Sequence, residues 1–206
     1  AIDESGNVLT STDPRDGPTA TWSVSKAVSA PLGAGRFTAL ACPTASLCVA
    51  VDYDGQVSLT ADPRLGAQAT WTPLPRNVDD VEWDDISCPS SSMCLIVGPE
   101  VMTLTNPGTP NASLEHKLLP LINRYSEADE VHGVSCTSTS FCLAVEGRGN
   151  AIRSSDPERG SRATWEVTPV DGLHALWSVS CASASLCVAV DDHGYAFVAH
   201  RRLATP

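Results

Sequence analysis

The chain has 206 residues, of which 42% are hydrophobic and 18% are charged; this is enough to bury a core and excludes a disordered protein. The formal net charge of −11 argues against nucleic acids and acidic membrane surfaces as partners, because their phosphates would be repelled. No apolar run approaches the roughly 18 residues that a membrane-spanning helix needs, so we expect no membrane span.

The first 25 residues, "AIDESGNVLTSTDPRDGPTATWSVS", predict two short strands joined by a long Asp-Pro turn. They contain neither the basic nor the apolar segment of a signal peptide, which we interpret as absent or already removed. Residues 37–74 predict four strands in succession, "FTALAC", "CVAVD", "QVSLTA" and "TWTPL". A five-residue loop, a "YDG" turn and the segment "DPRLGAQA" separate these strands.

The cysteine-containing half of this pattern occurs four times, as "LACPTASLCVAV", "ISCPSSSMCLIV", "VSCTSTSFCLAV" and "VSCASASLCVAV". The first cysteines are Cys42, Cys88, Cys136 and Cys181, so successive copies are 46, 48 and 45 residues apart. Two-helix repeats share this period, but short, β-branched, alternating segments favour the four-stranded blade of a propeller. The second copy is degenerate, because "TLTNPGTPNASLEHKLLP" replaces its Asp-Pro turn and tryptophan.

We therefore predict an all-β fold, a single β-propeller domain over residues 1–206 built of four-stranded antiparallel blades. The expected repeat units are about 1–31 (partial), 32–78, 79–127, 128–172 and 173–206 (partial). Third strands number five and cysteine hairpins number four. We prefer five sectors, with the ring closed by strands from both termini; four blades are the alternative, and a piece of a larger ring is a third.

The turns between third and fourth strands carry the most specific motif. Three copies read "STDPRDGPTATW" (11–22), "TADPRLGAQATW" (60–71) and "SSDPERGSRATW" (154–165). They resemble a lengthened Asp-box, the Ser-x-Asp-x-Gly-x-Thr-Trp turn of sialidase-type propellers. The resemblance implies a structural role, in which Asp accepts backbone N–H groups, Gly takes a positive φ and Trp covers the joint between sheets. The motif residues are Asp13, Gly17, Trp22, Asp62, Gly66, Trp71, Asp156, Gly160 and Trp165.

The eight cysteines form four pairs with five residues between their members, which places two Cβ atoms opposite each other across a hairpin. We predict the disulfides Cys42–Cys48, Cys88–Cys94, Cys136–Cys142 and Cys181–Cys187. Zinc and free thiols are the alternatives, but structural zinc sites usually have about two to four residues between paired cysteines. A disulfide framework belongs to an oxidising compartment, so we expect a secreted or extracellular protein.

The ligand face of a propeller is built by the turns between second and third strands and by the connections between blades. These segments are acidic here, with Asp3, Glu4, Asp52, Asp54, Asp79, Asp80, Glu82, Asp84, Asp85, Glu127, Asp129, Glu130, Glu146, Asp191 and Asp192. Clustered carboxylates attract cationic partners or hold Ca²⁺, and "DYDG" resembles the start of a calcium loop whose remainder is missing. We expect no metal or other cofactor, with Ca²⁺ as the alternative.

Aromatic and polar side chains on this face are the candidate ligand-binding residues: Tyr53, Asp54, Trp83, Asp84, Tyr125, His132, His174 and Trp177. We interpret Trp83 and Trp177 as standing at equivalent positions before their cysteine hairpins, which fits either sugar stacking or core packing. Sialidases need an arginine cluster, a Tyr/Glu nucleophile pair and an acid Asp. No arginine recurs at corresponding first-strand positions, so we carry over no catalytic residue.

These observations favour a secreted, non-catalytic recognition domain, lectin-like, that binds glycans or a cell surface through its loop face. The alternative is a protein-interaction or adaptor subunit of a larger secreted assembly, such as a toxin complex. A sialidase-like glycoside hydrolase is the third hypothesis. The preference for Ala, Asp-Pro and Arg over Lys is typical of GC-rich bacteria.

Overall fold

The computed structural model of the chain describes residues 1–3, 5–26, 36–75, 81–119, 130–172 and 174–200. These residues form antiparallel strands and short 3-10 turns, which confirms the all-β prediction. None of the helical segments in this described part is long and apolar enough to cross a membrane.

Four sheets, each containing one cysteine hairpin, are the four blades of a propeller. Blade 1 comprises β3 (Phe37–Thr44), β4 (Leu47–Asp52), β5 (Val57–Thr60) and β6 (Thr72–Pro73). Blade 2 comprises β7 (Asp85–Ser90), β8 (Met93–Val97), β9 (Val101–Thr105) and β10 (Ser113–Lys117). Blade 3 comprises β11 (Val131–Ser138), β12 (Phe141–Glu146), β13 (Asn150–Ser154) and β14 (Glu166–Pro169). Within the described residues, blade 4 comprises β15 (Leu176–Ser183), β16 (Leu186–Asp191) and β17 (Ala196–His200).

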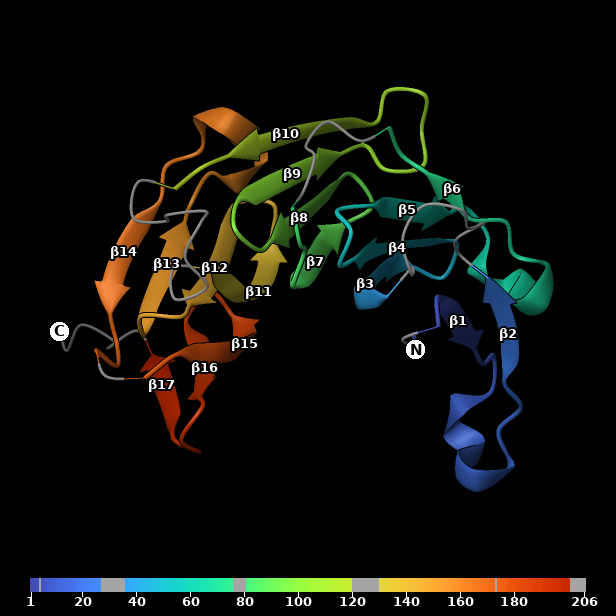
Figure 1. Cartoon of the computed structure of the whole chain (residues 1–206), viewed down its shortest axis with the longest axis horizontal. Helices are drawn as coiled ribbons and strands as arrows, with labels where there is room; N and C mark the ends of the chain where they lie inside the picture. Colours follow the sequence, from blue (N-terminus) through green and yellow to red (C-terminus); the bar gives the residue numbers. More distant parts are fainter. Residues whose placement is uncertain (4, 27–35, 76–80, 120–129, 173, 201–206) are drawn as a thin grey trace, which may run out of the picture.

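A two-stranded sheet, which we call the N-terminal sheet, precedes blade 1 and consists of β1 (Asn7–Thr10) and β2 (Ser23–Lys26). The sheets follow one another along an arc, with the N-terminal sheet at one end and blade 4 at the other (Figure 1). The first strands β3, β7, β11 and β15 contact one another in this order and are the inner strands of the arc.

The four-blade alternative is therefore the correct one, and neither the preferred five sectors nor ring closure by both termini is supported. β1 has the sequence of a third strand, but it pairs with β2 and packs against blade 1 without a cysteine hairpin of its own. Among the described residues, β17 pairs with β16, and no N-terminal strand joins the sheet of blade 4. Counting third strands overestimates the number of blades, because the isolated pair β1–β2 has the same sequence pattern as the third and fourth strands of a complete blade.

The hydrophobic core consists of separate clusters, one at each joint between successive sheets. Val49 and Val51 of β4 pack against Trp83 and Ile86 of blade 2, and all four are at most 6% exposed. The joints between the N-terminal sheet and blade 1, between blades 2 and 3 and between blades 3 and 4 each have a cluster of the same kind. Each blade therefore depends on its neighbours to cover its faces.

The two ends of the arc expose side chains whose counterparts are buried elsewhere. All six residues of β4 are buried, whereas burial alternates along β16, where Val188 and Val190 are 37% and 41% exposed. At the other end Trp22 is 52% exposed, while its counterpart Trp71 is 8% exposed. The alternation follows from strand geometry, because only one face of β16 lies against blade 3.

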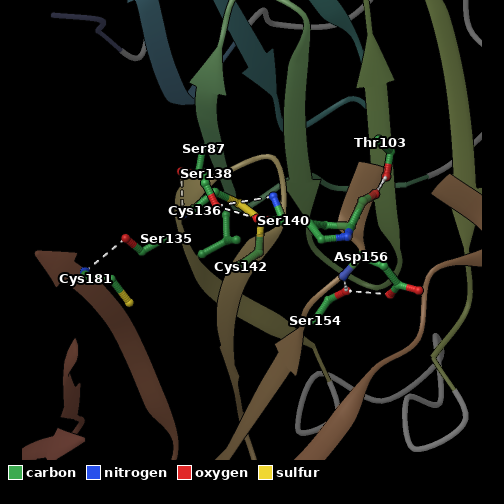
Figure 2. Close-up of a disulfide and its surroundings, with 12 residues drawn as sticks. Ser87, Thr103, Ser135, Cys136, Ser138, Ser140, Cys142, Ser154, Asp156 and Cys181 are labelled. Atoms are coloured by element: carbon green, nitrogen blue, oxygen red, sulfur yellow. Dashed lines mark hydrogen bonds between the residues drawn. A yellow bond between two sulfur atoms is a disulfide. The ribbon is translucent and has the colours of Figure 1, made fainter. Parts of the chain in front are cut away.

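The four predicted disulfides are confirmed, with Cα–Cα distances of 4.0–4.1 Å and no free cysteine. Cys136 and Cys142 lie directly opposite each other in the ladder of β11 and β12. Figure 2 shows the polar links around them: the Cys136 amide donates to Ser87 Oγ at 2.9 Å, and the Cys181 amide donates to Ser135 Oγ at 3.0 Å. These side chain–backbone bonds tie the inner strand of blade 2 to that of blade 3, and the inner strand of blade 3 to that of blade 4.

The three Asp-Pro turns share one backbone shape, in the segments η1 (Pro14–Thr19), η2 (Pro63–Gln68) and η4 (Pro157–Arg162). The central glycine of each turn has φ of 55° or 56°, a conformation that favours glycine. Asp156 accepts hydrogen bonds from the Thr164 amide at 2.7 Å and its hydroxyl at 2.8 Å, and Asp13 accepts the Thr21 amide at 3.2 Å. The degenerate second copy lacks the turn, and β10 instead contacts η4 through Glu115 and Lys117.

Candidate functional site

The acids that end the second strands are structural parts of their turns. Asp52 is 2% exposed, and its Oδ1 accepts the amides of Asp54 at 3.0 Å and Gln56 at 2.8 Å. The same pattern of two accepted amides recurs at three further turns, formed by Asp3, Glu146 and Asp191. The "DYDG" segment is thus a backbone turn whose first carboxylate is already occupied. Each of these acids therefore already accepts hydrogen bonds from the backbone of its own turn.

A β-bulge recurs in the inner strands of blades 1, 3 and 4, near the loop face. The ladder between first and second strands skips a residue at Thr38, His132 and Trp177, each of which lies four positions before its first cysteine. Asp84 holds the same position in blade 2, directly before β7, where its amide donates to the Val97 carbonyl at 2.8 Å. A bulge leaves its extra residue unpaired and redirects its side chain, so these positions form one row across the four blades.

The residue one position earlier points into the core in every blade. Phe37, Trp83, Val131 and Leu176 are 7%, 1%, 0% and 0% exposed. The Trp83 indole donates to the Gly55 carbonyl at 3.2 Å between blades 1 and 2. The Trp83 ring is therefore not presented to a ligand. Trp83 and Trp177 are not equivalent, because their positions relative to the first cysteine of the blade differ by one residue.

Trp177 is the most prominent aromatic side chain of the row. Its side chain is 53% exposed, and its ring stacks on His132 at 4.3 Å between centroids with an interplanar angle of 15°. Gly133 allows this approach, because a Cβ there would lie 3.0 Å from Cα of Ser178. One indole face is thus supported by an imidazole of the preceding blade.

His132 also faces two carboxylates. Its Nδ1 lies 3.8 Å from Oδ2 of Asp84, and one ligand atom each from Asp84, Glu130 and His132 lies within 4.8 Å of the others. Oδ2 of Asp84 is buried and has no hydrogen-bond partner among the described residues. This Asp84–Glu130–His132 cluster lies at the joint between blades 2 and 3.

Tyr53 extends the site onto blade 1. It is 40% exposed, and the Arg36 guanidinium lies over its ring at 4.5 Å from the centroid. Hydrogen bonding with Glu82 and the negative charge of that carboxylate raise the pKa of Tyr53, with a smaller contribution from the charge of Glu130. The face therefore combines two exposed aromatic rings with intervening carboxylates.

A second cluster on blade 4 contains His174, Asp192 and His193. The two imidazole rings lie 3.6 Å apart between centroids, and His193 Nδ1 lies 2.7 Å from Asp192 Oδ1. This hydrogen bond is the main cause that raises the pKa of His193. Tyr125, the remaining candidate, lies outside the described residues.

Sequence reasoning did not single out Arg36 and His193. The sequence does contain a signal for each residue. Arg36 directly precedes β3, the first strand of blade 1, and His193 occupies in the turn of blade 4 the position that Asp54 occupies in the turn of blade 1. The bulge row itself is also readable, as the position four residues before each first cysteine.

Comparison with known proteins supports the fold. No family model matches the chain, and no curated protein matches it. Similar solved structures include YCF48 from Cyanidioschyzon merolae, with 14% identity, a TM-score of 0.68, and coverage of 97% of this chain and 65% of that one. Virginiamycin B lyase from Staphylococcus aureus has 7% identity, a TM-score of 0.63, and coverage of 98% and 69%. Kuenenia stuttgartiensis hydrazine synthase has 10% identity, a TM-score of 0.56, and coverage of 76% and 56%.

The chain thus spans less than two thirds of the YCF48 and hydrazine synthase chains. At these identities the likeness shows the fold alone, a β-propeller, and gives no residue-level correspondence.

Proposed function

We propose that this protein is a recognition domain that binds its ligand through the loop face described above, and that the ligand is a glycan. The observation that carries the proposal is Trp177, a half-exposed indole supported from behind by His132. A rigid aromatic plane beside hydrogen-bonding carboxylates is suited to a sugar, which offers a C–H face and several hydroxyls. The propeller fold is compatible with a binding role of this kind.

Binding to a glycan array, followed by titration of the best glycan against variants, tests the proposal. Trp177→Ala is expected to weaken binding at least about tenfold, since it removes the stacking plane. Trp22→Ala is the matched control, because Trp22 is equally exposed but lies in the turn of the N-terminal sheet. Absence of glycan binding, or equal effects of the two variants, would overturn the proposal.

The second candidate function is a protein-interaction or adaptor role in a secreted assembly. The net charge of −11 and the carboxylates between the aromatic residues favour a basic partner. Pull-down followed by native mass spectrometry distinguishes the two functions: a stoichiometric basic protein partner, without glycan binding, supports this candidate. In both cases we propose secretion, with which the four disulfides are compatible.

We further propose that the three Asp-Pro turns are of the Asp-box type and act structurally. Their common backbone and the hydrogen bonds to Asp13 and Asp156 support this. A sialidase-like activity has weaker support, since the described residues place a single arginine, Arg36, over the Tyr53 ring and no arginine cluster. A panel of fluorogenic glycosides tests it, and hydrolysis abolished by Glu82→Gln would establish it.

A further inference from the structure

We propose that Asp84, Glu130 and His132 bind one divalent transition-metal ion at the joint between blades 2 and 3. Two ligand atoms at about 2.1 Å from one zinc ion lie no more than about 4.2 Å apart. The His132 Nδ1–Asp84 Oδ2 distance of 3.8 Å falls within this limit, and all three ligand atoms lie within 4.8 Å of one another.

The orphaned oxygen of Asp84 is the second observation that points to a cation. Oδ2 is buried and accepts no hydrogen bond from the described residues, and His132 Nδ1 is too distant to provide one. A buried carboxylate oxygen without a partner is costly. A metal ion between Asp84 and His132 would satisfy this oxygen and the imidazole nitrogen together.

The scaffold holds the ligands in place before any ion arrives. The Asp84 amide donates to the Val97 carbonyl at 2.8 Å, and the Glu130 carbonyl accepts the Gly147 amide at 3.1 Å. His132 lies at a bulge, and Trp177 stacks on its ring. All three ligands are partly exposed, so a position on the metal stays open for water or for an external ligand.

The ligand types select the class of metal. Ca²⁺ and Mg²⁺ prefer oxygen ligands only, whereas imidazole suits zinc and its transition-metal neighbours. Two carboxylates and one imidazole therefore favour Zn²⁺, Mn²⁺, Fe²⁺, Co²⁺ or Ni²⁺ over the Ca²⁺ considered from the sequence. The His174–Asp192–His193 cluster is a poorer site, because His193 Nδ1 is already hydrogen-bonded to Asp192.

Titration of metal-depleted protein with Zn²⁺ by calorimetry, and with Co²⁺ by visible absorption, tests the site. We expect one equivalent to bind to the wild type and affinity to fall at least about tenfold in Glu130→Gln and His132→Ala. His174→Ala is the matched control, which removes an imidazole from the other cluster, and it should retain wild-type affinity. No glycan is present, so this result is independent of the proposed function.

Three results would overturn the proposal: no saturable binding to the wild type, unchanged affinity in Glu130→Gln, or loss confined to His174→Ala. Glu130→Gln keeps the size and shape of the side chain, and its melting temperature without metal shows whether it folds normally. With Mn²⁺ as a paramagnetic probe, the indole N–H resonance of Trp177 should broaden selectively. Broadening confined to His193 instead would place the ion in the other cluster and refute the assignment.

Discussion

Two valines at one register position provide a test of how neighbouring blades stabilise each other. Val145 of β12 lies opposite Gly133, and Val190 of β16 lies opposite Ser178, at the same step beyond the bulge. Val145 is fully buried in the cluster that contains Leu176 and Val179, whereas Val190 is 41% exposed. The same substitution, Val→Ala, therefore removes the same atoms from two different environments.

The expected costs follow from burial. Removing two carbon atoms from the closed joint at Val145 loses about 1.6 kcal/mol of transfer free energy, and the cavity raises the cost to about 2–3 kcal/mol. At Val190 part of the side chain already contacts water and no closed cavity forms, so we expect less than about 1 kcal/mol. For a chain of this size the melting temperature should fall by about 4–12 °C for Val145→Ala and by less than about 4 °C for Val190→Ala.

Urea unfolding with the disulfides intact, followed by tryptophan fluorescence, measures both free energies, and thermal melts provide the second measurement. Equal losses for the two variants would refute the reasoning, because they would mean that the outward face of β16 is covered in solution. Repeating the melts at several protein concentrations shows whether another copy covers it, since association makes the melting temperature concentration-dependent.

Three further predictions test the hairpins and the turns. Replacing Cys136 and Cys142 together by Ala should lower the free energy of unfolding by only about 2–3 kcal/mol, because the disulfide closes a short loop. Intact masses of the wild-type protein, alkylated with and without prior reduction, verify that the disulfides are formed. Hydrogen bonds from the Thr164 amide and hydroxyl lower the pKa of Asp156. The stability that they contribute is therefore present above the ordinary pKa of Asp and is lost as the pH falls through the lowered pKa. Asp156→Asn should reduce this loss of stability at acid pH, as measured by melting temperatures across pH. Gly55→Ala should cost more than about 1 kcal/mol by urea unfolding, because φ is +80° and the new Cβ would lie 2.6 Å from a backbone oxygen, and a loss below this value would contradict the turn geometry.

The features readable from the sequence are those set by neighbouring residues. The spacing of Cys136 and Cys142 predicts a hairpin and its bond because both depend on a single loop. The number of blades depends instead on which strands join one sheet and which sheets pack against each other, and these contacts are between residues far apart in the sequence. The segment Asn7–Thr10 has the pattern of a third strand but stands in a separate sheet, and no local pattern distinguishes these outcomes.

Site residues were harder to predict because a single step of register reverses the direction of a side chain. Trp83 and Trp177 stand five and four residues before their first cysteines, and that difference buries one and exposes the other. The alternation of an ordinary strand does not reveal this, since the bulge shifts the register at Trp177. The contact of Arg36 with the Tyr53 ring lies within blade 1, and it becomes visible only when β3 and β4 are paired.

The bulge row links the regularity of the scaffold to the diversity of the face. Blades 1, 3 and 4 repeat the same bulge, and Asp84 holds the matching position of blade 2, but the residue differs from blade to blade: Thr38, Asp84, His132 and Trp177. The residue type varies along this row, whereas the buried position one residue earlier is apolar in all four blades. A hydroxyl, a carboxylate, an imidazole and an indole therefore stand on adjacent blades at fixed relative positions. Exchanging the residues at 132 and 177 should preserve folding but abolish both metal and glycan binding, since each depends on the order of side chains along the row.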